Sequence, residues 1–315
     1  MEPVLVLFQT TPAHRERLSA AAPDAQFYYG AGEIPEEMLS QVRVVLGNPP
    51  MELLKKLPAL ELLQLSTAGV GFYTRPGALP EKVVLTNASG AYGAGIAEHM
   101  LGMALTLLKK LHRYRDNQRE GRWKDEGTVC SILGAKILAV GLGDIGGEFA
   151  RRVRAMGAYV IGIKRIPAPR PDFVDELYTL DKLDECLSRA DIVFLSLPET
   201  PATRGLFGAD RLARMKEGAI LLNAGRGSAV DTGALCDAVE SGRLGGAGLD
   251  VTDPEPLPEG HRAWSVRDIL ITPHVSGGYH LPYTHDRIVE ICGENLRRFR
   301  AGEPLLHRVD RKEGY

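Results

Sequence analysis

The sequence predicts an α/β fold built from two domains. Its 315 residues correspond to roughly two domains at about 150 residues each. Short apolar runs rich in β-branched residues alternate with longer amphipathic segments, which is typical of parallel strands joined by helical crossovers. Apolar residues make up 44% of the chain and charged residues 25%, so there is enough apolar material for sizeable cores.

The first domain is predicted to begin with short strands. None of these runs is long enough to form a helix of its own, and polar or proline-containing segments separate them. The strands are expected at residues 4–8, 26–29, 42–47 and 62–65. Residues 87–95 then contain Gly90, Gly93 and Gly95 and precede a helical run at 96–114, so a domain boundary is expected there.

The second domain is predicted to start with a strand at 136–140 and to end near a strand at 269–272. An amphipathic helix at 283–300 follows, and we expect it to return to the first domain and close a cleft. Its apolar side consists of Ile288, Ile291, Cys292, Leu296 and Phe299. The sequence therefore predicts two Rossmann-like or flavodoxin-like domains with parallel sheets: 1–96 with 281–315, and an inserted domain at 97–280.

Composition argues against several classes of partner. The net charge of -2 leaves no excess positive field for a nucleic acid. No apolar stretch approaches the roughly 20 residues that span a bilayer, and the first apolar run has no basic segment before it, so neither a membrane span nor a signal peptide is expected. The four cysteines form no Cys-x-x-Cys pair. This predicts free thiols in the cytoplasm and no metal site.

A glycine-rich turn after the strand at 136–140 predicts a dinucleotide site. Gly141, Gly143 and Gly146 form a G-x-G-x-x-G motif between this strand and a helical run. In such a site the first glycine allows the tight turn, the second lets the backbone approach the pyrophosphate, and the third lets helix and strand pack closely. The motif alone is a weak signal, because a glycine turn can be purely structural, but the flanking strand and helix strengthen it.

The next strand, at 159–163, ends where an NAD-specific site usually offers a carboxylate to the adenosine ribose. This chain has Lys164 and Arg165 there instead. Two cations can pair with a 2'-phosphate, which favours NADP over NAD while leaving NAD possible. The alternative is that both side chains simply solvate the strand end.

Three later strands deliver chemically useful residues to one edge of the predicted sheet. Arg226 follows the strand at 218–223, Glu255 follows the strand at 248–251, and His274 follows the strand at 269–272. Ligands of open α/β sheets bind at the carboxyl ends of the strands. Each residue alone has an ordinary explanation, as a surface ion pair, a solvated loop or a turn residue, but their joint placement indicates a catalytic set.

The chain resembles the D-isomer-specific 2-hydroxyacid dehydrogenases over nearly its whole length. The resemblance is carried by an ordered series of motifs, which is far more specific than any one of them. These are Ser-Thr-Ala-Gly-Val at 66–70, Thr-Asn at 86–87, Ala-Glu-His at 97–99, Gly-Arg-Trp at 121–123, the glycine motif at 141–146, Leu-Pro at 197–198, residues 223–227, Leu-Asp-Val at 249–251, Glu-Pro at 255–256 and Thr-Pro-His at 272–274.

The resemblance implies a role for each matched residue. Arg226, Glu255 and His274 would form the catalytic set, with Arg226 and the Gly69-Val70 backbone binding the substrate carboxylate. The cofactor site would also include Asp144 and Ile145 at the pyrophosphate, Asp250 at the nicotinamide amide, Gly277 beside the ring, and Pro198 and Ala224. Many relatives have an acidic residue just after the Gly69-Val70 loop, whereas this chain has Gly71, so side-chain selectivity at that loop is open.

These residue types suit the reduction of a 2-oxo acid. Negative charge builds on the carbonyl oxygen as hydride reaches the carbon, so the site needs a proton donor and a cation. The His274 imidazolium can donate the proton, Glu255 can orient and stabilise it, and the Arg226 guanidinium can hold a carboxylate. Under this interpretation 1–96 with 281–315 binds substrate and 97–280 binds the cofactor.

Several alternatives stay open at this point. A nicotinamide-sensing binding or corepressor module could share the fold, although the triad is complete. The substrate could be glyoxylate or hydroxypyruvate, as in the reductases of this family, or a bulkier aliphatic or aromatic 2-oxo acid. A homodimer is expected, with Tyr92, His99 and Trp123 in structural or dimer-contact roles. Its apolar patch is predicted from Met100, Leu101, Met103, Leu105 and Leu108.

Overall fold

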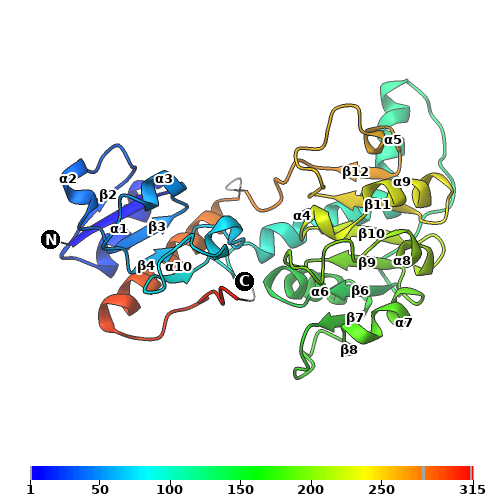
Figure 1. The fold of residues 1–315 in the computed structure, drawn as a ribbon. Helices are drawn as coiled ribbons and strands as arrows, with labels where there is room; N and C mark the ends of the chain where they lie inside the picture. Colours follow the sequence, from blue (N-terminus) through cyan, green and yellow to red (C-terminus); the bar gives the residue numbers. More distant parts are fainter. Residues whose placement is uncertain (1, 279–280, 313, 315) are drawn as a thin grey trace. The chain divides into compact units, whose positions relative to one another are not determined.

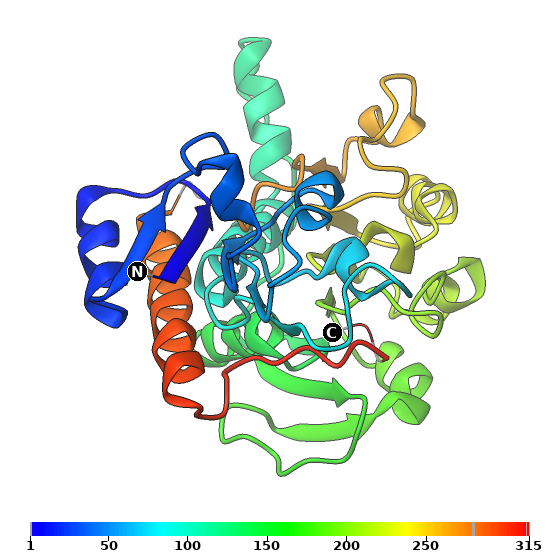
Figure 2. The same cartoon turned by 60° about the vertical axis from the view of Figure 1, so that its left-hand side comes forward.

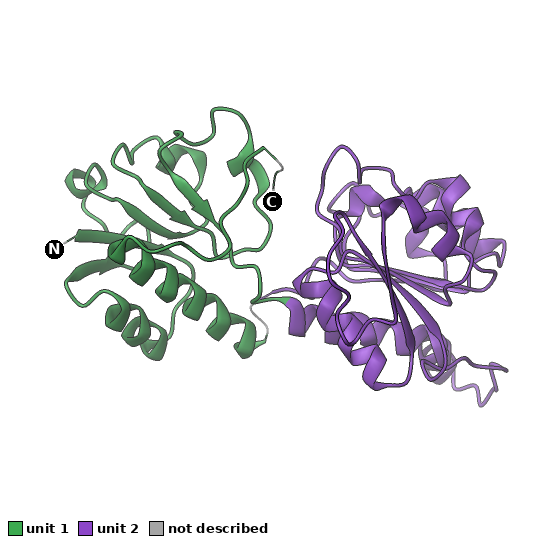
Figure 3. Ribbon diagram, turned by 90° about the horizontal axis from the view of Figure 1, so that it is seen from below, with its two compact units in different colours: residues 1–92, 279–315 green, residues 93–278 purple. Residues whose placement is uncertain are grey.

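The computed structural model describes residues 2–278, 281–312 and 314 and confirms the predicted α/β class with two parallel sheets (Figure 1). The chain divides into two compact units (Figure 3). Unit 1 consists of residues 1–92 and 279–315, and unit 2 consists of residues 93–278. The chain thus leaves unit 1, completes unit 2 and returns.

Unit 1 is built on a five-stranded parallel sheet in the order β2-β1-β3-β4-β5. Successive residues of β1 and β3 point to opposite faces of the sheet, and almost all of them are buried. Both faces of this parallel sheet are therefore covered. The sequence predicts the first four strands to within two residues but not β5. The strands are β1 (Glu2–Leu7), β2 (Ala25–Tyr28), β3 (Val44–Gly47), β4 (Leu62–Gln64) and β5 (Val84–Thr86).

Helices α1 (Pro12–Ala21) and α10 (Pro282–Ala301) pack against each other, and α10 also contacts β4 (Figure 2). The predicted helix at 283–300 is therefore confirmed, and it does return to unit 1. The predicted apolar residues Ile288, Ile291, Cys292 and Leu296 are buried. Asn295, also fully buried, donates to Gln64 Oε1 at 2.6 Å, so a polar contact fixes α10 against β4.

The opposite side of this sheet carries shorter elements. The helices there are α2 (Glu36–Leu39) and α3 (Met51–Leu54), followed by the 3-10 turn η1 (Gly71–Thr74). Leu5, Val45 and Leu63 belong to one buried cluster that also includes Val70 and Tyr73. The loop after β4 is thus anchored by the core of unit 1.

Unit 2 contains a seven-stranded parallel sheet in the order β12-β11-β10-β9-β6-β7-β8. The sheet extends in one direction from β6 through β7 and in the other through β9, so the strand order reverses beside β6. Its strands are β6 (Lys136–Val140), β7 (Tyr159–Lys164), β8 (Glu176–Thr179), β9 (Ile192–Leu195), β10 (Ile220–Asn223), β11 (Gly246–Leu249) and β12 (Ile269–Ile271).

Helices cover both faces of this sheet. Phe149 of α6 stacks on Phe194 of β9 at 4.2 Å between ring centroids, and α4 contacts α6, β10 and β11. The helical elements are α4 (Gly93–Leu108), α5 (Leu111–Arg119), α6 (Asp144–Ala155), η2 (Leu180–Lys182), α7 (Leu183–Leu187), α8 (Ala209–Arg214), η3 (Gly227–Ala229), α9 (Thr232–Glu240) and η4 (Arg262–Trp264).

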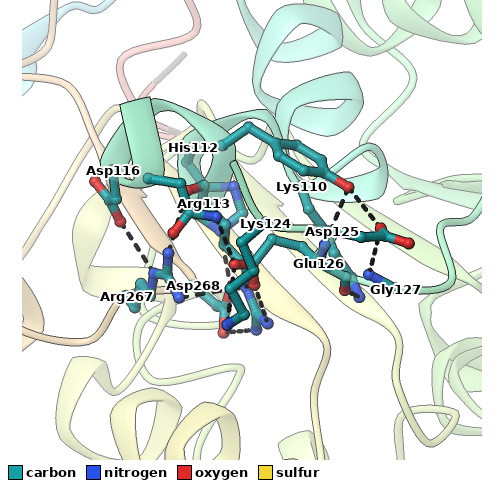
Figure 4. Close-up of polar contacts among 12 residues, drawn as sticks. Lys110, His112, Arg113, Asp116, Lys124, Asp125, Glu126, Gly127, Arg267 and Asp268 are labelled. Carbon is teal, nitrogen blue, oxygen red and sulfur yellow. Dashed lines mark hydrogen bonds and ion pairs between the residues drawn. The ribbon is translucent and has the colours of Figure 1, made fainter. Parts of the chain in front are cut away.

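The single helix predicted at 96–114 is wrong, because the chain breaks at Lys110. This residue has a left-handed backbone with φ of 55° and is the N-cap of α5, which starts as a separate helix directly after it. Two side chains of α5, His112 and Arg113, bind the carboxylate of Asp268 just before β12 (Figure 4). These polar contacts favour a break between the two helices. The helical spacing of apolar residues in the sequence continues past Lys110 and so does not reveal the break.

No helix in the described ranges is long and apolar enough to cross a bilayer. Among the same residues no group of His, Cys, Asp or Glu side chains is placed to hold a metal ion.

Candidate active site

Arg226, Glu255 and His274 follow three neighbouring strands of unit 2. Arg226 comes after β10, Glu255 after β11 and His274 after β12, and these strands pair in the order β12-β11-β10. All three strands are parallel, so the three residues emerge at the same edge of the sheet.

Glu255 and His274 are in direct contact. The Nδ1 atom of His274 lies 2.6 Å from Oε1 of Glu255, and both side chains are partly exposed. An ionised carboxylate only accepts hydrogen bonds, so Nδ1–H is the donor. The other ring nitrogen, Nε2, makes no hydrogen bond within the described part of the chain. The ring is therefore oriented by one nitrogen and has the other available.

His274 has an unusual backbone conformation. Its φ of 53° lies in the left-handed region, which costs a residue with a side chain about 1–3 kcal/mol in general. Its N–H donates to Asp250 O at 2.8 Å and to Thr272 O at 3.0 Å. The surrounding backbone therefore holds the histidine in a conformation that it would not adopt alone.

The Asp250 side chain holds the segment that carries His274. Asp250 is 2% exposed and follows β11 directly. Its Oδ1 accepts from Thr272 Oγ1 at 2.5 Å and from Val275 N at 3.0 Å. Its Oδ2 accepts from Ser276 N at 3.2 Å and from the Ser276 hydroxyl. The carboxylate expected at the nicotinamide amide thus makes its contacts to residues 272–276.

Arg226 makes no ion pair within the residues that the structure describes. One guanidinium nitrogen donates to Gly225 O at 2.7 Å, and the side chain is half-buried. The alternative of Arg226 as half of a surface ion pair thus finds no partner among the described residues. A partly buried guanidinium without a carboxylate partner is a suitable ligand for an anionic group.

The Gly69-Val70 loop lies in unit 1, after β4. Side chains fix it on both sides: Thr67 Oγ1 donates to Gly69 O at 2.7 Å, and Asn87 Nδ2 donates to Ala68 O at 2.8 Å. Within the described ranges the N–H groups of Gly69 and Val70 make no hydrogen bond. Successive backbone N–H groups without an internal acceptor form a site for an anion.

A pocket of about 620 Å³ adjoins the same loop in unit 1. It lies at the carboxyl ends of β1 to β4, where the strand order reverses between β1 and β3. Its lining includes Leu7, Phe8, Tyr29, Asn48 and Thr67. Asn48 Nδ2 donates to Thr67 Oγ1 at 3.0 Å, so the pocket and the loop share one hydrogen-bonded wall.

The glycine motif has the geometry that a dinucleotide site needs. Gly141 has φ of 98°, and a Cβ on Gly146 would lie 1.8 Å from Gly141 O, which leaves no room for a side chain. Gly143 is exposed with no atom within 4 Å of its Cβ position, and it is the N-cap of α6. The turn therefore offers an open helix N-terminus to a pyrophosphate.

Asp144 and Ile145 form the first turn of α6, as the resemblance implies. The Asp144 carboxylate accepts from Gly93 N at 2.8 Å, so it caps the start of α4. This contact links the glycine turn to the helix that follows the boundary between the units, and no local sequence pattern indicated it.

Lys164 is the last residue of β7, and Arg165 is exposed directly after it. The other expected cofactor residues also follow strand ends of unit 2. Pro198 comes after β9, and its carbonyl accepts from Thr203 Oγ1 at 2.7 Å. Ala224 is buried after β10, and Gly277 comes three residues after His274. These positions surround the edge of the sheet at which Arg226, Glu255 and His274 lie.

Three residues of uncertain role have different environments. Tyr92 is buried in unit 1 and donates to Ser66 O at 2.5 Å, which is a structural contact. Trp123 is fully exposed. His99, on α4, lies 3.0 Å from Thr272 Oγ1 through Nε2, a contact with the segment before His274 that sequence reasoning missed.

The apolar patch predicted on α4 is buried in part: Leu101 and Leu105 are partly exposed, whereas the other three residues are not. Met100, Met103 and Leu108 are buried inside unit 2. A Cβ added to Gly248 of β11 would touch Met103, which shows how closely this helix packs on the sheet. Most of the predicted apolar residues of α4 therefore pack into the core of unit 2.

Comparisons with known proteins agree with this geometry. Residues 101–276, more than half of the chain, match the family model of the D-isomer specific 2-hydroxyacid dehydrogenase NAD binding domain. A glycerate dehydrogenase of Methylorubrum extorquens is 28% identical, with 92% of this chain and 95% of that protein covered.

Two solved structures cover the whole of both chains. A D-isomer specific 2-hydroxyacid dehydrogenase of Xanthobacter autotrophicus, in complex with NADPH and MES, has a TM-score of 0.84 at 32% identity. An NADPH-dependent glyoxylate/hydroxypyruvate reductase of Sinorhizobium meliloti, in complex with NADP and sulfate, has a TM-score of 0.85 at 27% identity. This chain therefore belongs to the D-isomer-specific 2-hydroxyacid dehydrogenase family and is an NAD(P)-dependent oxidoreductase.

Proposed function

We propose that this enzyme reduces 2-oxo acids to D-2-hydroxy acids with NADPH, and that His274 is the general acid. The observation that carries the proposal is the 2.6 Å contact between His274 Nδ1 and Glu255 Oε1. It fixes the ring, stabilises the imidazolium by charge, and leaves Nε2–H to donate a proton to the carbonyl oxygen.

The substrate carboxylate would be held by Arg226 and by the backbone of Gly69 and Val70. The Arg226 guanidinium has no ion-pair partner in the described chain, and the two N–H groups have no acceptor there. Both can therefore receive an anion without giving up an internal contact. Arg226 would also stabilise the negative charge that develops on the carbonyl oxygen. In this assignment unit 1 binds the substrate.

Unit 2 would bind the cofactor, whose reduced nicotinamide supplies the hydride when bound. The open turn at Gly143 and the N-terminus of α6 would hold the pyrophosphate, with Asp144 and Ile145 beside it. The rest of the cofactor would lie along the strand ends of unit 2, beside Pro198, Ala224, Asp250 and Gly277.

We propose NADP as the preferred cofactor. Lys164 and Arg165 stand at the end of β7, where the adenosine ribose arrives in this fold. Two cations there can bind a 2'-phosphate, and no carboxylate occupies either position. The bound NADPH and NADP of the Xanthobacter and Sinorhizobium proteins support this choice.

Glyoxylate and hydroxypyruvate are the first substrates to test. The Sinorhizobium relative is named for them, and a glyoxylate reductase of Korarchaeum cryptofilum is 30% identical to this chain. The pocket beside the Gly69-Val70 loop would take the substrate side chain. A steady-state screen of glyoxylate, hydroxypyruvate, 2-oxoisocaproate and phenylpyruvate with NADPH tests the proposal. Reduction of none of them would contradict it.

A homodimer is also proposed, with a revised contact surface. Since Met100, Met103 and Leu108 are buried, the exposed apolar side chains of the segment after α4 are the better candidates. These are Leu111, Trp123, Val129 and Leu133. Light scattering at micromolar concentration should give the mass of a dimer, and Trp123→Arg should shift it to that of a monomer. A monomeric wild-type chain would contradict the proposal.

We place the enzyme in the cytoplasm. Cys130, Cys186, Cys236 and Cys292 are all free, which is the state that a reducing compartment maintains.

A further inference from the structure

His274 is held in its left-handed conformation by contacts that start outside its own segment. The backbone N–H groups of Val275 and Ser276 both donate to the Asp250 carboxylate, which is nearly inaccessible to water. Hydrogen bonds from several donors to one buried carboxylate fix a short segment firmly, because releasing them would leave a buried charge unpaired. The Asp250 carboxylate therefore anchors the two residues that directly follow the histidine.

Thr272 connects this carboxylate to α4. Its hydroxyl has a single hydrogen, and the contact of 2.5 Å with Asp250 Oδ1 requires that hydrogen, since an ionised carboxylate cannot donate. The contact of 3.0 Å with His99 Nε2 must then have Nε2–H as donor and the threonine oxygen as acceptor. The single hydroxyl hydrogen thus determines which group donates in each of the two hydrogen bonds that connect His99, Thr272 and Asp250.

His99 is suited to this position because it comes from a rigid element. It lies on α4, and Met100 and Met103 beside it are buried against unit 2. Its side chain is 27% exposed, and Nε2 is 4.0 Å from Asp250 Oδ1, too far for a direct hydrogen bond. Within the described chain the threonine hydroxyl therefore provides the hydrogen-bonded connection between the imidazole and the carboxylate.

We propose that His99 and Thr272 are positioning residues for the acid–base histidine, acting through Asp250. They hold residues 272–276 so that His274 keeps its left-handed backbone and presents Nε2 in one direction. The inference rests on the proposed role of His274 as general acid. Neither His99 nor Thr272 is assigned to the substrate or the cofactor, and the pyrophosphate turn is untouched, so their removal should lower the turnover number far more than it weakens cofactor binding.

Substitutions at Thr272 separate the hydroxyl from the volume of the side chain. Thr272→Val keeps the shape but removes both hydrogen bonds, whereas Thr272→Ser keeps the hydroxyl. We expect Thr272→Val to lower kcat by about tenfold to a hundredfold, since small displacements of a catalytic group have effects of this size. Thr272→Ser should stay within about threefold of wild type in kcat, and the NADPH dissociation constant should change by less than about threefold in both variants.

Substitutions at His99 test the other hydrogen bond of the Thr272 hydroxyl. His99→Gln places an amide N–H near the position of Nε2 and should retain most of kcat, whereas His99→Leu should lose about as much as Thr272→Val. Ser188→Ala, which removes a hydroxyl that donates to Glu185 O at the end of α7, is the control and should leave kcat unchanged. Equal kcat in wild type, Thr272→Val and His99→Leu would overturn the inference, as would equal losses in Thr272→Val and Thr272→Ser.

Hydrogen exchange tests the anchor independently of catalysis. In Thr272→Val the amides of Val275 and Ser276 should exchange faster by about tenfold, while peptides from β6 and α6 stay unchanged. Unchanged exchange at these amides would also overturn the inference. If instead His274→Ala keeps full activity, the proposed function fails, and the exchange measurement still decides whether the anchor exists.

Discussion

Glu255 and His274 are joined by a hydrogen bond of 2.6 Å between Oε1 and Nδ1, although they follow different strands of the sheet. The contact depends on the parallel pairing of β11 with β12, which brings both loops to one edge. A histidine held in this way has one ring nitrogen committed to its orientation and the other available for proton transfer.

Glu255→Gln should move the loss of activity at high pH to lower pH. The glutamine keeps a hydrogen-bond acceptor for Nδ1–H but removes the negative charge that favours the imidazolium. The profile of kcat/KM for reduction against pH measures this shift, with Glu259→Gln as the control. Superimposable profiles for wild type and Glu255→Gln would mean that the carboxylate charge does not support proton donation.

Arg226→Lys should raise KM for the 2-oxo acid by about tenfold or more. Lysine keeps the positive charge but cannot make two parallel hydrogen bonds to a carboxylate. KM for NADPH should change little, because Arg226 is assigned to the substrate. An unchanged KM for the 2-oxo acid in steady-state assays would mean that Arg226 has a structural role and does not bind the substrate.

Exchanging the cations at the end of β7 should reverse cofactor preference. Wild type is expected to favour NADPH over NADH by at least about tenfold in kcat/KM, because charge-assisted hydrogen bonds contribute about 1.5–3 kcal/mol each before screening. Lys164→Asp combined with Arg165→Ala should favour NADH. Lys216→Asp, before β10 and paired with Asp191, is the control for a general charge effect. A wild-type preference for NADH would contradict the assignment.

Asp268→Asn should destabilise the protein by about 1–3 kcal/mol at neutral pH, because it leaves His112 and Arg113 without their anion. Burial raises the pKa of Asp268, but hydrogen bonds from His112 and Arg113 outweigh it, so that its pKa lies well below the ordinary value.

The lowered pKa gives this effect a definite pH dependence. The stabilisation by Asp268 is complete above the unfolded-state pKa of about 3.9 and is lost as pH falls through the folded-state pKa. Urea unfolding at pH 7 and pH 3 should therefore show a smaller difference between wild type and Asp268→Asn at the lower pH. Asp237→Asn, which removes an exposed partner of Arg262, should have almost no effect at either pH.

The strand ends could be predicted from sequence because buried parallel strands consist of short apolar runs and the residues after them are polar. Arg226, Glu255 and His274 all follow such runs, and their common edge is a consequence of parallel pairing. The glycine spacing identified the cofactor turn for a similar reason, since Gly141 and Gly146 have no room for a side chain.

Other features depend on packing that no local pattern describes. The break at Lys110 occurs without a glycine or proline, and it is stabilised by the contacts of His112 and Arg113 with Asp268. The contact between His99 and Thr272 joins residues 173 positions apart. Apolar periodicity also identified a set of residues on α4 without showing that unit 2 itself buries Met100, Met103 and Leu108.

The most direct test of the account is the turnover number of His274→Ala with NADPH and the best 2-oxo acid from the screen. Loss of a general acid should lower kcat by about 100- to 10,000-fold. The dissociation constant for NADPH, measured by its fluorescence, should stay within about twofold, because the pyrophosphate turn at Gly143 is untouched. A kcat within twofold of wild type would contradict the assignment of His274 as the proton donor.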